Sequence, residues 1–319
     1  MLILAGIDIG TNTLRLLIAE FSPDGSYRKI ESNRQVTRLG EEISRTGRLK
    51  AGAMERTIGV LEEFSRTCSR YPVAGIYTVA TSAVREASNG ADFVRRVKER
   101  AGLDVQVISG DEEARLTMLG VSSGLDIEGK DVLLMDIGGG STEFVSVSKG
   151  EISFKVSTDI GVVRFTEQYI HSDPPESGEI ETLELAIKKQ LGTLPVFLKI
   201  KNTGSVPEML KEGLIGTAGT VTTLAAIEQK MTVYDPDKVN GFRIRRDRIQ
   251  EIRRALSRMT IKEREQVPGL EKGREDIIVA GAVMVDEVME WFGFGEIVVS
   301  DSGLREGLVI DLYHRLSKS

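Results

Sequence analysis

An apolar strand that ends in Asp-Ile-Gly and continues into small polar residues occurs twice in this chain. The two copies read LAGIDIGTNT (4–13) and LLMDIGGGST (133–142). Their aspartates, Asp8 and Asp136, lie roughly 130 residues apart, which is too long for a solenoid repeat and suits two copies of one domain plan. The sequence therefore predicts two domains of similar architecture.

The composition is that of a soluble globular protein. The chain has 319 residues, of which 40% are hydrophobic and 28% charged, enough for about two domains with separate cores. The single cysteine, Cys68, forms no internal disulfide, and the N-terminus lacks the basic leader and cleavage site of a signal peptide. No apolar run approaches the roughly 18 residues of a membrane span. We expect a protein of the reducing cytoplasm.

The net charge of −6 argues against binding of nucleic acid or an anionic membrane through bulk electrostatics. Two segments, 28–50 and 242–264, are nevertheless basic, and in the second nine Lys or Arg face three Asp or Glu. The apolar residues of that second segment recur at helical spacing: Ile249, Ile252, Leu256 and Met259. The spacing favours the solvated side of an amphipathic helix, and a basic wall beside a polyanion site is the alternative.

The first half predicts a strand–turn–strand unit followed by alternating helices and strands. We expect strands at 2–9, 15–21, 75–81 and 105–109, and helices at 53–71, 89–102 and from 111 to about 119. Single strands that alternate with helices indicate an α/β sheet with right-handed crossovers.

The same plan restarts after a polar, turn-rich joint at 124–131. We expect strands at 131–138, 142–148, 152–158, 213–218 and 296–303, and helices at 162–170, 181–194, 221–229 and 305–316. The predicted domains are residues 1–125 with a C-terminal helix at about 306–319, and residues 126–305.

The small residues after each Asp-x-Gly can bind phosphate. Gly permits close approach, so a run such as Gly138–Thr142 can wrap a phosphate in backbone N–H donors, and hydroxyl groups add more. The predicted phosphate-binding residues of the two loops are Gly10, Thr11, Asn12, Gly138, Gly139, Gly140, Ser141 and Thr142. An aspartate that faces a polyanion needs a metal between them, so Asp136 is a candidate Mg²⁺ ligand. For either copy alone, the alternative is a bulged hairpin that binds nothing. The occurrence of two copies at the start of two matching domains favours phosphate binding.

Two later turns repeat the pattern of a strand that ends in small residues before a helix. In LIGTAGTVTTLAA (214–226) the helix N-terminus follows Gly219 and Thr220, so free N–H groups and the helix dipole favour an anion there. An ordinary strand–helix turn with a Thr cap is the alternative. SDSGLREG (300–307) follows the last strand in the same way.

These motifs together resemble the actin, hexokinase and Hsp70 superfamily. The chain is most similar to the exopolyphosphatase and guanosine pentaphosphate phosphohydrolase (Ppx/GppA) family, in segments whose order matches along almost the whole chain: 6–19, 80–90, 107–116, 133–144, 160–167, 215–220, 273–282 and 300–307. The resemblance implies an α/β fold of two ribonuclease-H-like domains, with mixed sheets flanked by helices and an interdomain cleft. Longer members carry a helical extension with a histidine–aspartate-type domain; this chain stops at Ser319 and resembles the short, two-domain form.

The resemblance also assigns roles. In ISGDEEARL (107–116) it implies that Glu113 is the general base that activates water, whereas simple capping of the helix by Asp111 and its neighbouring acids is the alternative. It implies that Asp136 and Glu143 bind Mg²⁺, and Asp8, the matching acid of the first copy, is a further candidate metal ligand. Further implied residues are the phosphate clamps Arg15 and Arg85, for which surface ion pairs are the alternative, and the weaker candidate Arg274.

The expected function is a Mg²⁺-dependent phosphoanhydride hydrolase that releases the terminal phosphate of polyphosphate, of guanosine pentaphosphate, a nucleotide of the stringent response, or of both. The expected partners are these substrates, with no nucleic acid and no membrane, and a homodimer is an open assembly state. One rival is an ATP-dependent kinase of the same superfamily. The other is a non-catalytic, nucleotide-dependent clamp or polymer.

Overall fold

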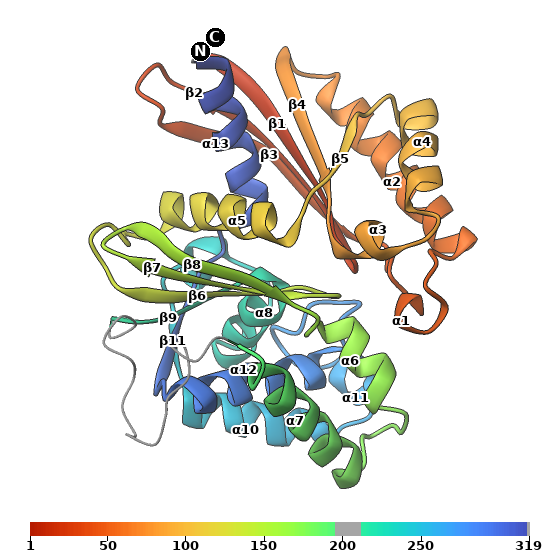
Figure 1. Ribbon diagram of the computed structural model, residues 1–319, viewed down its shortest axis with the longest axis vertical. Helices are drawn as coiled ribbons and strands as arrows, with labels where there is room; N and C mark the ends of the chain where they lie inside the picture. The colour runs from red at the N-terminus through yellow and green to blue at the C-terminus, as the bar shows by residue number, and fades with distance from the viewer. Residues whose placement is uncertain (195–211, 318–319) are drawn as a thin grey trace. The chain divides into compact units, whose positions relative to one another are not determined.

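The computed structural model describes residues 1–194 and 212–317. The chain forms two compact units, one of Met1–Ser123 together with the segment from Ser302 onward, the other of Gly124–Asp301 (Figure 1). The C-terminal helix thus belongs to the same unit as the N-terminal strands. No helix within the described residues is long and apolar enough to cross a membrane.

The first unit is built on a five-stranded mixed sheet of order β3-β2-β1-β4-β5. Its elements are β1 (Leu2–Ile9), β2 (Thr13–Phe21), β3 (Tyr27–Val36), α1 (Ile43–Thr46), α2 (Ala51–Cys68), β4 (Val73–Ala80), α3 (Ser82–Glu86), α4 (Gly90–Ala101), β5 (Val105–Val107), α5 (Gly110–Gly124) and α13 (Leu304–Ser317). The first three strands pair antiparallel through short turns, whereas β4 and β5 follow helices and pair parallel. This is the α/β plan that the sequence predicts.

Helices cover both faces of this sheet. On one face, helices α2 and α4 bury residues such as Ile58 and Phe93 against apolar side chains of the first two strands. On the other face, α13 packs on β1 and β2 through Val309 and Ile310, and α5 joins it through Leu116. Figure 1 shows α13 and the α2–α4 pair on opposite sides of the strands.

Strand β3 is absent from the sequence prediction. Its residues, YRKIESNRQV, are mostly polar or charged, and none is fully buried. The strand lies at the edge of the sheet, where charged side chains discourage pairing with other chains. A search for apolar alternation therefore misses it.

Helices α5 and α13 approach each other at glycines. A Cβ added at Gly120 would lie 1.8 Å from the carbonyl oxygen of Gly303, and one added at Gly307 would lie 1.9 Å from that of Leu116. Real Cβ atoms do not come so close to backbone, so a side chain at either position must force the two helices apart.

We expect Gly307→Ala to lower the free energy of unfolding by about 3 kcal/mol or more, because overpacking against backbone leaves no side chain that can yield. Urea denaturation measures the loss. Gly59→Ala is the matched control: Gly59 lies within helix α2 with no atom near its added Cβ, so alanine should stabilise by about 0.5–1 kcal/mol. Equal stability of the two variants would contradict the close helix contact.

The second unit repeats the plan on a six-stranded sheet of order β10-β11-β9-β6-β7-β8. Its elements are β6 (Val132–Ile137), β7 (Thr142–Ser148), β8 (Glu151–Thr158), α6 (Val162–Tyr169), α7 (Ser177–Leu191), β9 (Gly213–Thr217), α8 (Ala218–Glu228), α9 (Pro236–Val239), β10 (Arg243–Arg245), α10 (Arg246–Ser257), α11 (Ile261–Arg264), α12 (Ile278–Phe292) and β11 (Glu296–Val299). Strands β8, β7, β6, β9 and β11 correspond in order to β3, β2, β1, β4 and β5. The short strand β10 is an addition that pairs antiparallel with β11.

Helix α12 is a second element that the sequence reading leaves out. Thirteen of its fifteen residues are buried, because it packs against α6, α7, α8 and α10. A helix that is buried on all sides has no polar face. In the segment IVAGAVMV, apolar and polar residues therefore do not alternate with the helical period.

The basic segment 242–264 forms helix α10 and its flanks, and its charges are largely paired within the unit. Ile249, Ile252 and Leu256 are buried, as the helical spacing predicts. Ion pairs of its arginines include Arg243–Glu296, Arg245–Asp247, Arg246–Asp286, Arg248–Glu228, Arg253–Glu184 and Arg253–Asp286. The pairing favours a solvated helix face over a basic wall for a polyanion.

Candidate active site

The two Asp-x-Gly segments form the same hairpin in the two units. In the first, the Gly10 N–H donates to the Thr13 carbonyl at 3.1 Å, and in the second the Gly138 N–H donates to the Ser141 carbonyl at 2.9 Å. Each hairpin joins the first two strands of its sheet, β1 to β2 and β6 to β7. The sequence repeat is therefore a structural repeat.

The turn of the first hairpin is anchored by neighbouring segments. The hydroxyl groups of Thr11 and Ser82 are hydrogen-bonded at 2.9 Å, and the Thr11 carbonyl accepts from the Gly40 N–H at 2.8 Å. The Asn12 side chain is buried, and no described residue accepts a hydrogen bond from its Nδ2. An unsatisfied buried amide typically costs about 1–3 kcal/mol, so a phosphate oxygen at this turn would relieve a real cost.

The turn of the second hairpin meets the start of helix α6. The carbonyls of Gly138 and Gly139 accept from the N–H groups of Val162 and Val163 at 3.0 and 2.9 Å. The Thr142 hydroxyl donates to the Ile160 carbonyl, so its single proton is used within the fold. The Thr142 hydroxyl is therefore not available to donate to a phosphate. The remaining predicted donors of this loop are its backbone N–H groups and the hydroxyl of the buried Ser141. Gly140, which the sequence also assigns to this loop, lies within the same turn.

Two predicted metal ligands lie opposite each other in the second hairpin. Asp136 on β6 and Glu143 on β7 are direct register partners, and directly opposite residues have Cβ atoms about 4.5–5.5 Å apart. Both are buried, and their position in the strands places them on the face opposite the one that carries Leu133, Met135 and the helix-packed core. The Ser157 hydroxyl donates to Glu143 Oε1 at 2.7 Å.

The equivalent positions of the first hairpin hold a different pair. Asp8 on β1 is the register partner of Arg15 on β2, and Arg15 Nη1 lies 3.3 Å from Asp8 Oδ2. The carboxylate of Asp8 therefore already has a cation beside it. Where the first unit sets an acid against an arginine, the second sets two acids at the facing positions of the hairpin.

No group of three or more His, Cys, Asp or Glu suited to a metal occurs among residues 1–194 and 212–317. A pair of carboxylates still fits Mg²⁺, which proteins commonly hold through one or two carboxylates while substrate phosphates and water complete the octahedron. Asp136 and Glu143 fit this mode better than Asp8 does.

The expected base and one expected phosphate clamp contact each other in the first unit. Arg85, at the end of helix α3, donates from Nη1 to the Ile108 carbonyl at 2.8 Å and lies 3.3 Å from Glu113 Oε2. Glu113 is only 7% exposed. The contact holds the carboxylate in one orientation and brings two residues that the sequence names separately into one site.

Helix capping does not account for Glu113. The helix begins at Gly110, one residue earlier than expected, and the Ser109 hydroxyl accepts from the Glu112 N–H at 3.2 Å. The alternative that Asp111 caps this helix is therefore not supported, because Ser109 precedes the helix and caps it. Glu112 turns outward to Arg115, whose Nε lies 2.8 Å away. Glu113 alone of these acids is buried.

The turn before helix α8 places a buried arginine against the helix N-terminus. Ala218 has a φ of 68°, a conformation that is costly for a residue with a side chain. A Cβ added at Gly219 would lie 1.9 Å from Arg274 Nη2, so only glycine admits the guanidinium there. Arg274 is 4% exposed and also contacts Glu271. The guanidinium and the helix N-terminus both favour an anion, which strengthens Arg274 as a candidate. Thr220 is buried.

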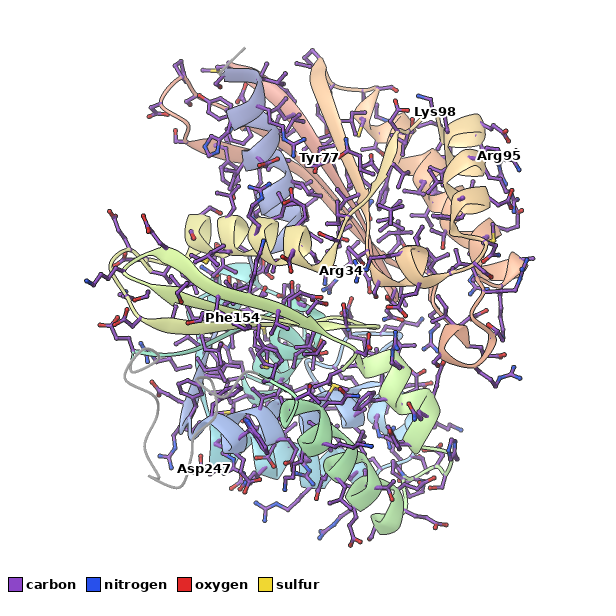
Figure 2. All side chains as sticks on the ribbon, viewed as in Figure 1. Arg34, Tyr77, Arg95, Lys98, Phe154 and Asp247 are labelled. Atoms are coloured by element: carbon purple, nitrogen blue, oxygen red, sulfur yellow. The ribbon has the colours of Figure 1, made fainter. Side chains whose placement is uncertain are left out.

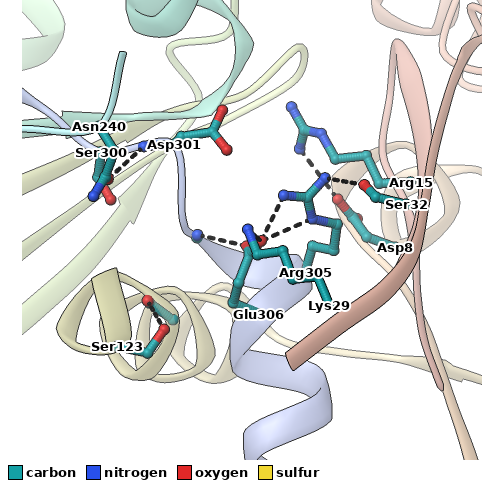
Figure 3. A network of polar contacts seen from close by, with 12 residues as sticks. Asp8, Arg15, Lys29, Ser32, Ser123, Asn240, Ser300, Asp301, Arg305 and Glu306 are labelled. Carbon is teal, nitrogen blue, oxygen red and sulfur yellow. Dashed lines mark hydrogen bonds and ion pairs between the residues drawn. The ribbon is translucent and has the colours of Figure 1, made fainter. Parts of the chain in front are cut away.

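Sequence reasoning misses an ionic network at the start of helix α13, shown in Figure 3. Glu306 is fully buried. Its carboxylate lies 3.0 Å from Lys29 Nζ and 2.5 Å from Arg305 Nη2, and it accepts from the Gly303 N–H at 3.0 Å. Burial raises the pKa of Glu306, but the charges of Arg305 and Lys29 outweigh it and hold the pKa at about 2.

This depressed pKa makes the network a source of acid-sensitive stability. Because the folded pKa of about 2 lies below the unfolded value, the contribution is complete above roughly pH 4.5 and is lost as the pH falls toward 2. We expect Glu306→Gln to lower the free energy of unfolding by about 3 kcal/mol at pH 7 and by roughly half of that at pH 3. Urea titrations at both pH values measure it. Glu63→Gln, on the exposed side of α2, is the control, and a pH-independent difference would refute the linkage.

Comparisons with known proteins agree on one family. A profile of the Ppx/GppA phosphatase family matches residues 18–316. Exopolyphosphatase 2 of Mycobacterium tuberculosis is 32% identical over 97% of this chain and 98% of its own length. A bifunctional 3-dehydroquinate synthase/phosphatase of Fusobacterium nucleatum is 33% identical over 96% of this chain, which spans only 46% of that protein.

Solved structures share the fold. The crystal structure of the Aquifex aeolicus member of the Ppx/GppA family superposes with a TM-score of 0.80 and 33% identity, covering 100% of this chain and 99% of the other. An exopolyphosphatase of Cytophaga hutchinsonii superposes with a TM-score of 0.87 and 29% identity, over 99% and 98% of the two chains. The expected actin-like fold, with two mixed sheets flanked by helices, is confirmed.

Proposed function

Because this chain belongs to the Ppx/GppA phosphatase family, and is thus a hydrolase of phosphoanhydride bonds, we propose that it releases the terminal phosphate of inorganic polyphosphate. Guanosine pentaphosphate is the second substrate that the family resemblance implies. The similarity to exopolyphosphatases over almost the full length supports the first substrate.

The buried contact between Glu113 and Arg85 carries the proposal. A carboxylate that is held in place and shielded from bulk water can accept a proton from an attacking water molecule. Arg85 keeps further N–H donors beyond the one that contacts Ile108 and Glu113, and a guanidinium can hold two phosphate oxygens at once. The pair therefore supports a base and a clamp that act on the same phosphate.

The proposed reaction is a direct displacement. One O–H bond of the water breaks, its proton moves to Glu113, and the oxygen bonds to the terminal phosphorus. The bond from phosphorus to the bridging oxygen breaks, so orthophosphate leaves and the chain is shorter by one unit. Phosphoryl transfer of this kind depends on positioning and charge stabilisation. In the first unit the loop at Gly10–Asn12 would supply N–H donors, and in the second unit the loop at Gly138–Ser141 and the first turn of α8 would supply them.

Asp136 and Glu143 would hold a Mg²⁺ ion. Bound there, the ion would supply positive charge to the phosphate oxygens. The fit rests on two buried, register-paired carboxylates at a place where the first unit has an acid and an arginine.

Phosphate release measured side by side on polyphosphate, guanosine pentaphosphate and ATP tests the proposal. We expect orthophosphate from polyphosphate in the presence of Mg²⁺, without ADP or a phosphorylated acceptor. Release from ATP alone, or transfer to a sugar or carboxylate, would favour the kinase. Turnover far below one per minute, together with nucleotide-dependent light scattering, would favour the clamp or polymer.

A further inference from the structure

A row of polar side chains crosses the second sheet at the level of the two candidate metal ligands. Asp136 on β6 is the register partner of Glu143 on β7 and of Thr217 on β9. Glu143 is in turn the partner of Ser157 on β8. Paired residues of neighbouring strands point to the same side of a sheet. These four residues, which we name the polar row, therefore share one face of the sheet.

The polar row follows an apolar stretch of the same face. One pleat earlier, strands β6, β7 and β9 carry the paired residues Leu134, Val145 and Ile215, all of them buried. The row itself is also buried at its centre, where Glu143 is 1% exposed. A carboxylate in such a place needs hydrogen bonds or a cation to offset its burial.

Ser157 gives Glu143 one of these hydrogen bonds from the edge strand β8. Val156, the residue before it, packs against the apolar core of the unit, so Ser157 points to the opposite side, where Glu143 lies. Figure 2 labels Phe154 on the same strand. The Ser157 hydroxyl donates to Glu143 Oε1 at 2.7 Å, which is a normal length for a hydrogen bond from a hydroxyl to a carboxylate. The bond limits rotation of the carboxylate about its last side-chain bond.

The first unit has a different residue at the position of Ser157. There the corresponding residues run from Asp8 to Arg15 and on to Arg34 of β3, which Figure 2 also labels. An arginine beside an acid adds a positive charge, whereas a serine hydroxyl gives the acid a hydrogen bond and adds no charge. A carboxylate that binds a cation does so through its negative charge. A neutral donor is therefore the kind of partner that suits a metal ligand.

We propose that Ser157 is a positioning residue of the candidate Mg²⁺ site, whose hydroxyl holds the Glu143 carboxylate in the orientation that binds the ion. The inference rests on the proposed function, because it takes Asp136 and Glu143 as the metal ligands. Hydrogen bonds from residues behind a metal ligand fix its orientation, and their loss typically lowers metal affinity by about 10–100-fold. Ser157 supplies one neutral bond, so the lower end of that range applies.

Direct binding of Mn²⁺, followed by electron paramagnetic resonance, tests this role without turnover. Mn²⁺ takes the same carboxylate and water ligands as Mg²⁺. We expect Ser157→Ala to raise the dissociation constant for Mn²⁺ by about tenfold. Ser157→Thr keeps the hydroxyl on a residue that suits a strand, so it should restore most of the affinity.

Ser153→Ala is the matched control, because Ser153 is a serine of the same strand whose hydroxyl also bonds to β7. Its partners are the carbonyl and the hydroxyl of Ser146, both at 3.0 Å, and not an acid. Both alanine variants lose hydrogen bonding between β8 and β7, so both should lower the melting temperature. Ser157→Ala should weaken Mn²⁺ binding, whereas Ser153→Ala should leave it unchanged.

A double-mutant cycle with Glu143→Gln separates positioning of a metal ligand from simple stabilisation of the strand. If Ser157 acts through Glu143, Ser157→Ala should weaken Mn²⁺ binding in the parent and have no further effect in the Glu143→Gln background. An equal loss in both backgrounds, an equal loss in Ser153→Ala, or no loss in Ser157→Ala would overturn the role. A parent that binds no Mn²⁺ would also overturn it, because no ion would then be held by Glu143.

Phosphate release from polyphosphate, measured on the same proteins, separates this inference from the proposed function. A parent that releases no phosphate, yet loses Mn²⁺ affinity in Ser157→Ala and not in Ser153→Ala, would refute the hydrolase and keep the positioning role. Release by the parent together with unchanged Mn²⁺ binding in Ser157→Ala would refute the positioning role and keep the hydrolase.

Discussion

Glu113→Gln is expected to abolish phosphate release from polyphosphate while the fold and substrate binding persist. Loss of a general base typically costs about 10²–10⁴ in rate. The amide has the same shape as the carboxylate, and its Oε1 can still accept a hydrogen bond from Arg85. The buried contact, 3.3 Å long in the parent, is therefore weakened but not lost. Initial rates of orthophosphate release, with thermal denaturation run in parallel, measure both quantities.

The adjacent acid offers a close control for this experiment. Glu112 precedes Glu113 in the same helical turn but pairs outward with Arg115, so Glu112→Gln should keep nearly full activity. A Glu113→Gln variant that retains more than about a tenth of the parent rate would show that another group takes the proton.

The second large effect is expected in the Mg²⁺ dependence. Asp136→Asn and Glu143→Gln should each raise the Mg²⁺ concentration for half-maximal activity by about 10–100-fold, because a neutral amide binds a hard cation more weakly than a carboxylate. Initial rates of phosphate release, titrated with Mg²⁺ for the parent and for each variant, measure the shift.

Glu151→Gln on strand β8 is the control for the metal prediction, because Glu151 is an exposed carboxylate of the same sheet. Its Mg²⁺ titration should match that of the parent. If the titrations of Asp136→Asn and Glu143→Gln also match, the two acids are not the metal ligands.

Much of the fold follows from local sequence. The Asp-x-Gly hairpins recur because an apolar strand that meets glycine and small polar residues has few ways to turn, and the backbone bonds at Gly10 and Gly138 are of the same kind. Helices that bury only one side, such as α4 and α10, can be predicted from the sequence, because their apolar residues recur with the helical period.

Strand β3 and helix α12, which the sequence did not predict, were missed for one physical reason. Strand β3 is mostly polar because it is an edge, and α12 is apolar all round because it is central. In both cases the environment that explains the composition is made by elements far away in the chain. The local pattern of apolar residues therefore does not reveal that environment.

The sequence alone determined the repeated hairpins and the kinds of residue that could bind phosphate, metal and water, since these depend on short segments. Only the tertiary structure decided which charges meet. It set Arg85 against Glu113 and Arg274 against Gly219, and it paired most arginines of α10 with acids. The physical reason is that an ion pair depends on the distance between side chains, and that distance is fixed by packing between segments that the sequence keeps far apart.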